Sequence, residues 1–551
     1  MFEEKIKEIL SRETRLKKEE IILEKPKENF GDYAFPCFIL AKTFKKNPIE
    51  IANDLKKKIK LTKDFEKVES ISGYLNFFIN KEGLIKNLLD SLNKKPKSKK
   101  KETILIESPG PNTNKPLHVG HLRNLFIGDS LARIFEFLGN NVKKVDVIND
   151  RGVHICKSML AYKKWGKNKQ PNKKSDHFVG DFYVLFSQKV KENPELEKEI
   201  QEMLKKWEEG DKETILLWKK MNSWAINGIK ETYKLLKFKH DKIYLESETY
   251  KKGKEIILDG LKKGLFKKKD DGAIFINLGN ELGEKILIRS DGTTVYITQD
   301  IYLAEKRYED FKFDKMIYVV GNEQIYHFKV LFKILKILGK KWAEKLYHLS
   351  YGMVNLPSGK IKSREGTTAD ADDLILELKE DAKTELEKRY KLNKTELEKR
   401  SLDIALAALK FTLLRVDAMK DMIFVKEEAL DFEGFSGPYL QYSYARASSI
   451  LKKVKETNKI NLKDLNEKEI LLVKKLAEFS ETVDRTSKEL KPDILAVYTY
   501  ELAKIFNDFY HNCPVLNSKE EQGRRIKIVK SFKETMKNCL DLLGIEPLEE
   551  M

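Results

Sequence analysis

The sequence predicts an α/β protein with a doubly wound parallel sheet, a small α+β domain before it and an all-α bundle after it. Three observations lead to this prediction. Short apolar runs at 103–107, 144–148 and 316–320 alternate with helical patterns, which is typical of a parallel sheet. The stretch up to about residue 80 combines one amphipathic helix with strand-like runs. From about Leu402 onward, apolar residues recur at helical spacing with almost no strand pattern.

Length and composition indicate several domains with a heavily charged surface. The chain has 551 residues, more than one hydrophobic core usually serves. It carries 106 Lys and Arg against 87 Asp and Glu, a formal net charge of +19. Such an excess favours polyanionic partners, although a generally Lys-rich proteome gives the same balance. Charge alone therefore leaves nucleic-acid binding and a merely solvated surface both open.

Cysteine spacing and hydropathy favour a cytoplasmic protein. The four cysteines form no C-x-x-C pair, which argues against a structural zinc site and against a disulfide framework. Reduced, mostly buried thiols are expected instead. The acidic, amphipathic N-terminus is unlike a signal peptide, and no apolar run approaches the ~18 residues that a membrane span needs.

Four segments follow one another along the chain. Residues 1–92 are predicted as the α+β domain, and residues 93–102, which are rich in lysine and contain a proline, as a linker. The same lysines could touch an RNA backbone, but a linker needs no such partner. Residues 103–400 are predicted as the α/β domain, with an insertion at about 173–284 that interrupts its alternation. Residues 401–551 are predicted as the helical bundle.

The strongest local pattern follows the strand at 103–107. There the polar segment SPGPNTNKPLHVGHL, residues 108–122, leads into a predicted helix. A helix N-terminus at such a position offers unpaired N–H groups and a partial positive charge, both of which suit phosphate. His118 and His121 lie on one face of that helix and can donate hydrogen bonds to phosphoryl oxygens. Gly120 leaves room for a flat base against the backbone.

Two other interpretations of the histidine pair are open. A His-x-x-His pair can bind a metal ion, but no nearby Cys or carboxylate completes a ligand set. Both rings could also be surface caps of the helix. The complete strand–turn–helix context favours phosphate binding over either interpretation.

The same segment resembles the H-I-G-H signature of class I aminoacyl-tRNA synthetases, and NTNKPLHVGHLRN at 112–124 is similar to its arginyl form. The resemblance extends over nearly the whole chain, through many separate motifs in the right order. It implies a class I synthetase with a Rossmann-like catalytic domain that uses ATP. Mg²⁺ is expected with the nucleotide, without a dedicated protein site. Nucleotidyltransferases for small metabolites share H-x-G-H, so they remain a rival.

A second class I element, K-M-S-K-S, is similar to Lys360-Ile361-Lys362-Ser363-Arg364, in which the second lysine falls on Ser363. The resemblance implies that Lys360 and Arg364 neutralise phosphoryl charge and that Lys362 and Ser363 contact ATP. A solvated basic loop is the structural alternative for this segment.

A lysine upstream of the histidine motif is the candidate for the missing charge. Arginyl enzymes often depart from K-M-S-K-S, and a lysine just before their histidine motif is thought to compensate. Lys115 occupies that position here, so the resemblance implies that it contacts ATP phosphates together with the two histidines. Whether Lys115 or Lys362 replaces the missing lysine stays open.

An arginine substrate makes a definite chemical demand. Its guanidinium is planar, permanently charged and rich in N–H donors, so a selective pocket needs carboxylates and an aromatic face. Composition cannot choose among the many acidic residues. The resemblance implies that Glu246, Tyr296 and Asp300 hold the guanidinium, and that Asn112 and Gln324 hold the α-amino end.

Three of these residues have a structural alternative. Glu246 could be surface charge, Tyr296 a core residue of a strand, and Asp300 the N-cap of a helix. In the family's Y-x-T-R-D pattern, the arginine is replaced here by Gln299. The i, i+4 separation of Tyr296 and Asp300 favours a shared site, because it places both on one side of a helical turn.

The helical part resembles the anticodon-binding domain of arginyl enzymes in GPYLQYSYARASSIL, residues 437–451. The resemblance implies tRNA(Arg) as a partner, with Gln441, Arg446 and Tyr510 as contacts. Aromatic rings beside arginine can stack bases and meet phosphates, although core packing is the alternative for most of these tyrosines. Residues 1–92 are similar to the domain that grips the tRNA elbow in this family.

The implied reaction is a two-step ligation of L-arginine to tRNA by a monomer. The arginine carboxylate attacks the α-phosphorus of ATP and releases pyrophosphate, and the 3′-terminal ribose of the tRNA then attacks the adenylate. The carboxylate is already a nucleophile, so positioning and charge stabilisation carry the catalysis. A non-catalytic RNA-binding paralogue is the second rival, and the intact histidine motif argues against it.

Overall fold

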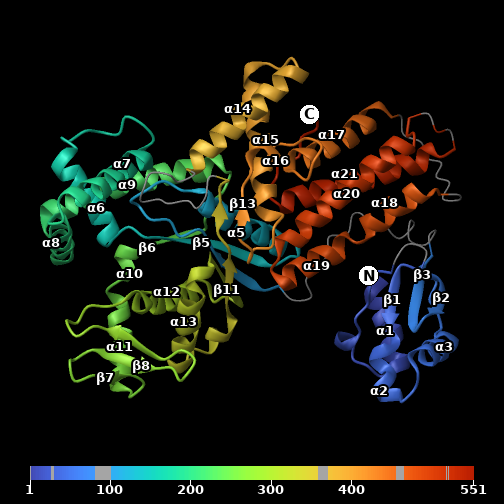
Figure 1. The fold of residues 1–551 in the computed structure, drawn as a ribbon, viewed down its shortest axis with the longest axis horizontal. Helices are drawn as coiled ribbons and strands as arrows, with labels where there is room; N and C mark the ends of the chain where they lie inside the picture. The colour runs from blue at the N-terminus through green and yellow to red at the C-terminus, as the bar shows by residue number, and fades with distance from the viewer. Residues whose placement is uncertain are drawn as a thin grey trace.

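The computed structural model describes residues 2–26, 30–80, 101–357, 370–454, 465–516, 518 and 520–551. Figure 1 shows a parallel sheet in the middle of the molecule, with insertion helices on one side and the helical bundle on the other. The predicted α/β fold with an α+β domain before it and an all-α domain after it is confirmed. None of the described helices combines the length and the apolar character that crossing a membrane requires.

The N-terminal domain is a three-stranded antiparallel sheet, in the order β1-β3-β2, packed against helices. Its elements are α1 (Phe2–Thr14), η1 (Lys18–Glu20), β1 (Tyr33–Pro36), η2 (Cys37–Leu40), α2 (Ala41–Phe44), α3 (Pro48–Lys58), β2 (Phe65–Ile71) and β3 (Tyr74–Ile79). The amphipathic first helix and the two-stranded turn after it agree with the sequence pattern. Most of the expected linker at 93–102 lies outside the described residues.

A five-stranded parallel sheet forms the centre of the α/β domain, in the order β11-β10-β4-β5-β6. Its strands are β4 (Thr103–Glu107), β5 (Asn141–Ile148), β6 (Lys242–Leu245), β10 (Lys315–Gly321) and β11 (Leu346–Tyr351). The chain leaves β4 toward β5 and β6, and it returns on the other side of β4 with β10 and β11. The carboxyl ends of β4 and β10 therefore mark the switch point at which such sheets hold ligands.

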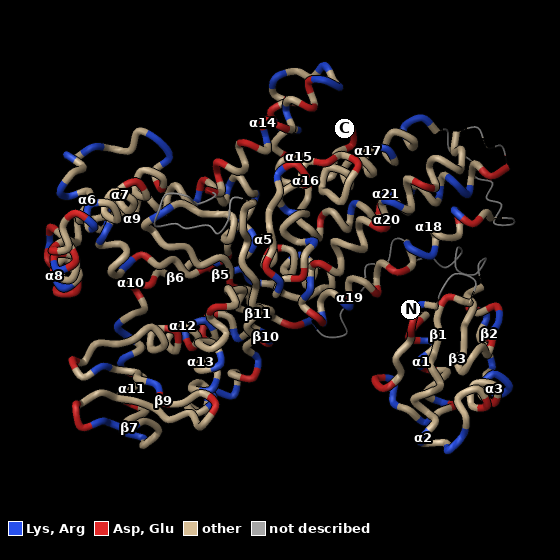
Figure 2. Tube along the Cα trace, viewed as in Figure 1, with Lys and Arg blue, Asp and Glu red and all other residues tan. Residues whose placement is uncertain are grey.

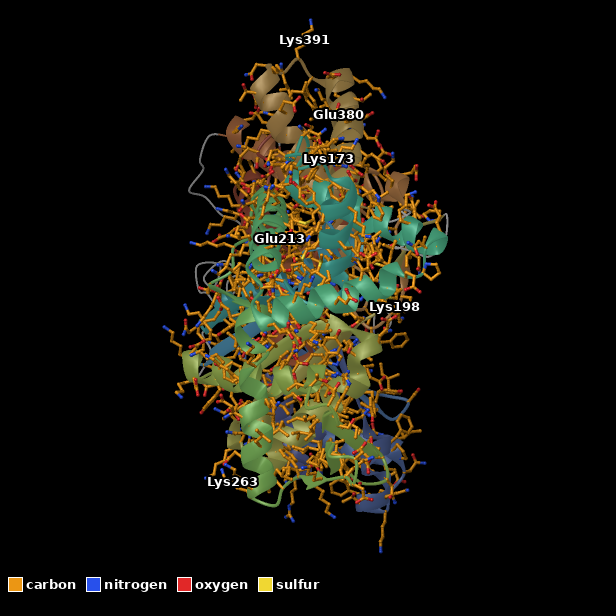
Figure 3. All side chains as sticks on the ribbon, turned by 90° about the vertical axis from the view of Figure 1, so that its left-hand side faces the viewer. Lys173, Lys198, Glu213, Lys263, Glu380 and Lys391 are labelled. Atoms are coloured by element: carbon orange, nitrogen blue, oxygen red, sulfur yellow. The ribbon has the colours of Figure 1, made fainter. Side chains whose placement is uncertain are left out.

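Helices and a small antiparallel sheet surround these strands. They are α5 (Val119–Phe137), α6 (Val153–Trp165), α7 (Ser175–Glu192), α8 (Leu196–Glu209), α9 (Lys212–Leu235), α10 (Glu246–Thr249), α11 (Lys252–Lys262), β7 (Lys267–Lys268), β8 (Ile274–Asn277), β9 (Glu284–Ile288), α12 (Tyr296–Phe311), η3 (Asn322–Gln324), α13 (Ile325–Ile337) and η4 (Lys341–Lys345). The expected insertion at about 173–284 returns to the central sheet once, because β6 pairs with β5. Seen from the insertion side, Lys173, Lys198 and Glu213 carry charges of both signs on its surface (Figure 3).

The C-terminal part is helical apart from one short pair of strands. Its elements are β12 (Val354–Asn355), α14 (Ala371–Arg389), α15 (Lys394–Leu414), β13 (Met422–Ile423), α16 (Lys426–Ala429), α17 (Gly437–Lys453), α18 (Glu467–Ala477), α19 (Phe479–Glu489), α20 (Pro492–Asn512) and α21 (Gln522–Leu542). Two ion pairs join this bundle to the N-terminal domain, Lys25 with Glu478 at 2.5 Å and Lys474 with Asp32. Figure 2 shows acidic and basic residues interspersed along the part of the chain that the structure describes.

The long helix α5 joins the sheet to the bundle. It packs against β4, β5 and β10 on one side and against α15, α19 and α21 on the other, and its side chains are buried along most of its length. Gly128 allows the close approach to β4, because a Cβ at this position would lie 2.6 Å from Ser108 Oγ. Asn124 donates to Val319 O at 2.7 Å and so ties the helix to the end of β10.

The Arg123 guanidinium extends this attachment to the residues just after β11 and to the loop after α15. It is fully buried, and it donates to Gly352 O at 2.8 Å, to Lys420 O at 2.9 Å and to Asp417 O at 3.1 Å. Hydrogen bonds from a charged donor to several carbonyl groups are strong, and leaving such acceptors buried without a partner is costly. Arg123 thus holds the end of β11 and the start of the bundle against α5.

Replacing Arg123 by methionine is expected to destabilise the protein by about 3 kcal/mol, because three carbonyl groups lose the same charged donor. The midpoint of thermal unfolding, followed by circular dichroism, measures the effect. Arg12→Met is the control, since the Arg12 side chain is exposed and bonds a single carbonyl oxygen. Equal midpoints for the two variants would contradict the anchoring role.

Candidate active site

A cavity of about 1240 Å³ opens at the carboxyl ends of the central strands. It brings together residues from β4, from the turn after β5, from the end of β6, from α12 and from the turn after β10. All five side chains expected to hold arginine line it, namely Asn112, Glu246, Tyr296, Asp300 and Gln324. The first and the last of them, Asn112 and Gln324, are more than two hundred positions apart in the sequence, so the sheet topology is what assembles the set.

Helix α12 presents two of these side chains. Tyr296 is its first residue and is exposed at the cavity, and Asp300 lies one turn further along. Asp300 Oδ2 accepts a hydrogen bond from His327 Nε2 at 2.6 Å, which links α12 to α13. The alternatives of a strand core for Tyr296 and an N-cap for Asp300 are wrong, because Tyr296 starts a helix whose N-cap is Val295.

Glu246 begins α10 directly after β6, and its side chain is buried, so the surface-charge alternative is also wrong. Burial raises the pKa of Glu246 to about 7, and the charge of Arg151 opposes this rise. The Arg151 guanidinium lies 3.8 Å from the Glu246 carboxylate. Gln299, which replaces the family's arginine, contributes a hydrogen bond that also favours the ionised form.

The turn after β4 shapes the opposite wall. Asn112 pairs with Asn149 in a parallel bridge, and Asn149 N–H donates to Pro111 O at 2.9 Å. Beneath them, Glu107 forms an ion pair with the buried Arg307. Burial raises the pKa of Glu107 to about 7, although Arg307 opposes this effect. Glu107 is therefore already neutralised by a partner, whereas Glu246 and Asp300 still face the cavity.

The two histidines stack at the N-terminus of α5. Their ring centroids lie 3.8 Å apart, and His118 N–H donates to His121 Nδ1 at 3.1 Å. Because Nδ1 of His121 accepts a hydrogen bond, the neutral ring carries its hydrogen on Nε2 and can donate it. His118 Nδ1 is buried without a hydrogen-bond partner among the described residues. This unused polar atom at a helix N-terminus favours an anionic ligand.

Burial and the charge of Lys115 keep both rings neutral. Burial lowers the pKa of His118 to about 3, and Lys115 adds to this effect. The pKa of His121 is lowered well below its ordinary value by burial, and His118 and Lys115 add to this effect. Lys115 therefore lies close enough to act on both histidines, as expected for one phosphate-binding cluster.

Gly120 lies against the His118 ring. A Cβ at this position would lie 3.1 Å from Cε1 and Nδ1 of His118. The glycine therefore leaves space for the His118 ring, and its expected role as a place for a flat base stays a prediction.

The described residues on both sides of 358–369 are anchored beside the histidines. Asp370 pairs with His118 in an antiparallel bridge, and Ala371 N–H donates to Leu117 O at 3.0 Å. On the other side, Gly352 is held by Arg123. The expected phosphate-binding residues Lys360, Lys362, Ser363 and Arg364 lie outside the described residues.

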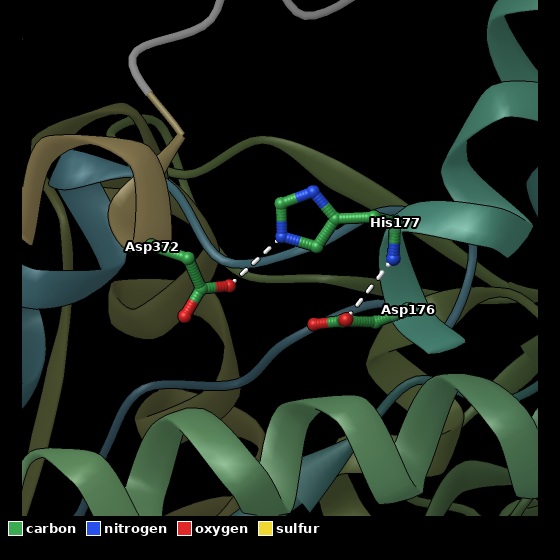
Figure 4. A group of neighbouring side chains, drawn as sticks. All are labelled: Asp176, His177 and Asp372. Atoms are coloured by element: carbon green, nitrogen blue, oxygen red, sulfur yellow. Dashed lines mark hydrogen bonds and ion pairs between the residues drawn. The ribbon is translucent and has the colours of Figure 1, made fainter. Parts of the chain in front are cut away.

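Among the described residues, one group has the geometry of a metal site, and it consists of Asp176, His177 and Asp372 (Figure 4). His177 Nε2 lies 2.9 Å from Asp372 Oδ2, and this hydrogen bond raises the pKa of His177. The Lys174 ammonium lies 2.9 Å from Asp176 Oδ2 and 2.7 Å from Asp372 Oδ2. Because lysine already neutralises both carboxylates, the group joins α7 to the start of α14 by ion pairs and does not favour a metal ion.

The bundle contains the three expected tRNA contacts. Arg446 lies 4.6 Å from the ring centroid of the half-exposed Tyr510, and it donates to Asn507 Oδ1 at 2.6 Å beside a cavity of about 240 Å³. Gln441 is fully buried, and its amide donates to Glu546 O at 2.8 Å. Gln441 therefore holds the C-terminal segment and does not reach the RNA-facing surface, contrary to expectation.

Among the other residues that line the cavity, Asn149, Arg151 and His327 had no expected role. Each follows a parallel strand of the central sheet. Their position after these strands could have predicted that they line the site, because the carboxyl ends of parallel strands meet at one edge of the sheet. The residues that they contact could not be predicted from the spacing of the sequence.

Comparisons with known proteins agree with this geometry. Three family models match, described as the arginyl tRNA synthetase N terminal domain over residues 1–79, the catalytic domain of class I (R) tRNA synthetases over 84–425 and the DALR anticodon binding domain over 440–551. The chain is 48% identical to the arginine–tRNA ligase of Treponema denticola, with 96% of this chain and 94% of the relative covered. It is 46% identical to that of Borrelia turicatae, with 99% and 97% covered.

A solved structure extends the likeness to the whole fold. The arginyl-tRNA synthetase of Thermus thermophilus superposes with a TM-score of 0.88 at 27% identity, and all of both chains is covered. The acidic cavity, the histidine pair at the N-terminus of α5, the three matching family models and these relatives lead to one conclusion: the chain belongs to the arginyl-tRNA synthetase family of class I aminoacyl-tRNA synthetases.

Proposed function

We propose that this chain is an arginine–tRNA ligase that activates L-arginine with ATP and transfers it to the 3′-terminal adenosine of tRNA(Arg), using the cavity at the carboxyl ends of the central strands. The observation that carries this proposal is the meeting of two chemistries in one place. Acidic side chains suited to a guanidinium line the cavity, and a cluster of imidazoles and an ammonium group suited to phosphates lies at the neighbouring N-terminus of α5.

The arginine side chain is assigned to the acidic end. Glu246 and Asp300 accept its N–H groups, and the Tyr296 ring covers its cationic face. The buried position of Glu246 supports this role, because a charge–charge interaction gains strength where water is scarce. Asn112 and Gln324 receive the α-amino group, which leaves the carboxylate directed toward the nucleotide.

The ATP phosphates are assigned to the histidine end. His118, His121 and Lys115 donate to phosphoryl oxygens and stabilise the charge that develops as the arginine carboxylate attacks the α-phosphorus. Lys360 and Arg364 assist them, with Lys362 and Ser363 at the nucleotide. Residues on both sides of 358–369 support this assignment, since Ala371 N–H donates to Leu117 O and Gly352 O accepts from Arg123, so both are bound to the segment that carries the histidines.

Mg²⁺ is assigned to the nucleotide and not to the protein. The one described group with metal-like geometry is neutralised by Lys174, so it does not fit a divalent cation. No step of the reaction is therefore routed through a protein-held ion.

The remaining domains are assigned to the tRNA. Residues 1–92 take the elbow, joined by the linker 93–102 to the catalytic domain 103–400, and residues 401–551 take the anticodon, with Arg446 and Tyr510 at its surface. A monomer suffices for the proposed activity, because the described site residues come from one chain. Light scattering in solution tests this oligomeric state. A cytoplasmic location suits the substrates and the four buried, unpaired cysteines.

Charging of purified tRNA(Arg) with each of the twenty amino acids tests the proposal. Arginine alone should give stable product, because a pocket built for several hydrogen bonds rejects ligands that leave them unpaired. Charging with another amino acid would overturn the proposal. ATP–pyrophosphate exchange that does not depend on arginine, without any tRNA charging, would support a small-metabolite nucleotidyltransferase instead.

Replacing Lys115 by alanine should slow arginine-dependent ATP–pyrophosphate exchange, measured with tRNA present, by about 100-fold, since one phosphate-binding charge is lost. Lys173→Ala is the control, because Lys173 is a half-exposed partner of Asp181 on the insertion surface. An unchanged rate in the Lys115 variant would remove this residue from the nucleotide site.

Replacing Glu246 by glutamine should raise the arginine KM by about 100-fold or more and leave the ATP KM nearly unchanged, because the guanidinium loses a carboxylate partner. Glu248→Gln is a matched control from the same short helix, where Glu248 is exposed and does not line the cavity. A wild-type arginine KM in the Glu246 variant would place the guanidinium elsewhere.

A further inference from the structure

The cavity already contains a guanidinium of the protein's own. Arg151 follows β5 at the cavity wall, and its side chain is only 9% exposed. The guanidinium lies 3.9 Å from the ring centroid of Tyr250 and 5.1 Å from that of Trp207. Such stacking on aromatic faces fixes the orientation of a cation. Arg151 is therefore a rigidly held positive charge inside the expected arginine site.

The contacts of Arg151 divide between two carboxylates. Nη2 lies 2.7 Å from Glu208 Oε1 on α8, which is a hydrogen-bonded ion pair. Nη1 lies 3.8 Å from Glu246 Oε1, beyond the length of a hydrogen bond. The charge of Arg151 thus acts on Glu246 without occupying the lone pairs of its carboxylate. Those lone pairs stay available to a second guanidinium.

We propose that Arg151 is a positioning residue for arginine binding: its fixed charge keeps Glu246 ready as a carboxylate for the substrate guanidinium, and its pair with Glu208 couples the insertion to the arginine site. This inference rests on the proposed function, which assigns the substrate guanidinium to Glu246. Arg151 itself touches no reacting atom in this assignment.

The charges around Glu246 explain why such a partner is needed. Asp150 and Arg151 face it from the turn after β5, and Asp300 faces it from α12, where it is paired with His327. Lys251 and Lys254 line the same cavity from the segment of α11. Two carboxylates and burial therefore disfavour the ionised form of Glu246, and Arg151 is the strongest opposing charge.

The direction of the pH effect follows from these charges. Burial raises the pKa of Glu246 to about 7 even with Arg151 in place. Without Arg151 the pKa rises further, by about 1–3 units for the loss of an adjacent opposite charge. Below that pKa, arginine must displace a proton from Glu246 in order to bind, so its KM rises about tenfold for each pH unit.

Charging of tRNA(Arg) with L-arginine by wild type, Arg151→Met and Arg151→Lys, between about pH 6.5 and about pH 8.5, tests the proposal. For Arg151→Met we expect an arginine KM raised about tenfold or more near pH 7, and a difference that shrinks toward the alkaline end. Arg151→Lys should recover most of the affinity, because it keeps the charge. The ATP KM and the kcat should change little.

Three results would overturn the inference. A KM that rises equally at every pH would indicate a purely structural role. A lower KM would mean that Arg151 competes with the substrate for Glu246. A methionine variant with the pH profile of wild type would show that the charge is not needed. If Arg151→Met does not fold, Arg151→Gln repeats the test with a neutral side chain that still hydrogen-bonds Glu208.

Glu246→Gln separates this inference from the proposed function. If the glutamine variant binds arginine like wild type, the arginine site itself is misplaced. If that variant loses affinity but the Arg151 variants keep a normal pH profile, only the role of Arg151 fails. In the double variant, the pH-dependent part of the Arg151 effect should vanish, because the titrating group is gone.

Discussion

The packing of α5 between the sheet and the bundle is the constraint on which the rest of the structure depends. The helix is buried along most of its length, but its first turn stays open at the switch point and carries the stacked histidines. Arg123, two residues beyond His121, binds backbone carbonyl groups from the end of β11 and from the loop after α15. The turn that carries the histidines therefore owes its position to contacts of the same helix with three other parts of the chain.

Charge balance is the second organising factor, and it differs between the two ends of the site. At the floor, Glu107 is neutralised by the buried Arg307. Toward the opening, Glu246 and Asp300 line the cavity, where Arg151 lies beside the first and His327 bonds the second. Because unpaired charge is costly where water is excluded, this end of the cavity favours a cationic ligand. In the proposed binding mode, Arg151 and an arginine substrate act on the same acidic group without sharing its lone pairs.

Local pattern predicted the regular elements well. The run at 103–107 is β4, and the helical spacing after the histidine motif is α5, because periodicity and turn residues act over a few positions. β6 was not predicted, since a strand of four residues is too short to show a period of its own. Gly120 shows a subtler limit. Its lack of a side chain was recognised, but the neighbour that needs the space, the His118 ring, became visible only in the folded chain.

By itself the sequence determined the fold class, the phosphate-binding motif and the identities of the five cavity residues, because these depend on local spacing and on resemblance in short segments. Only the tertiary structure decided which groups are partners. Gln441 is buried against the C-terminal segment, Asp300 bonds His327, and Arg151 stands beside Glu246. Ion pairs and burial join residues far apart along the chain, and their strength depends on distance and on the exclusion of water, neither of which a linear pattern contains.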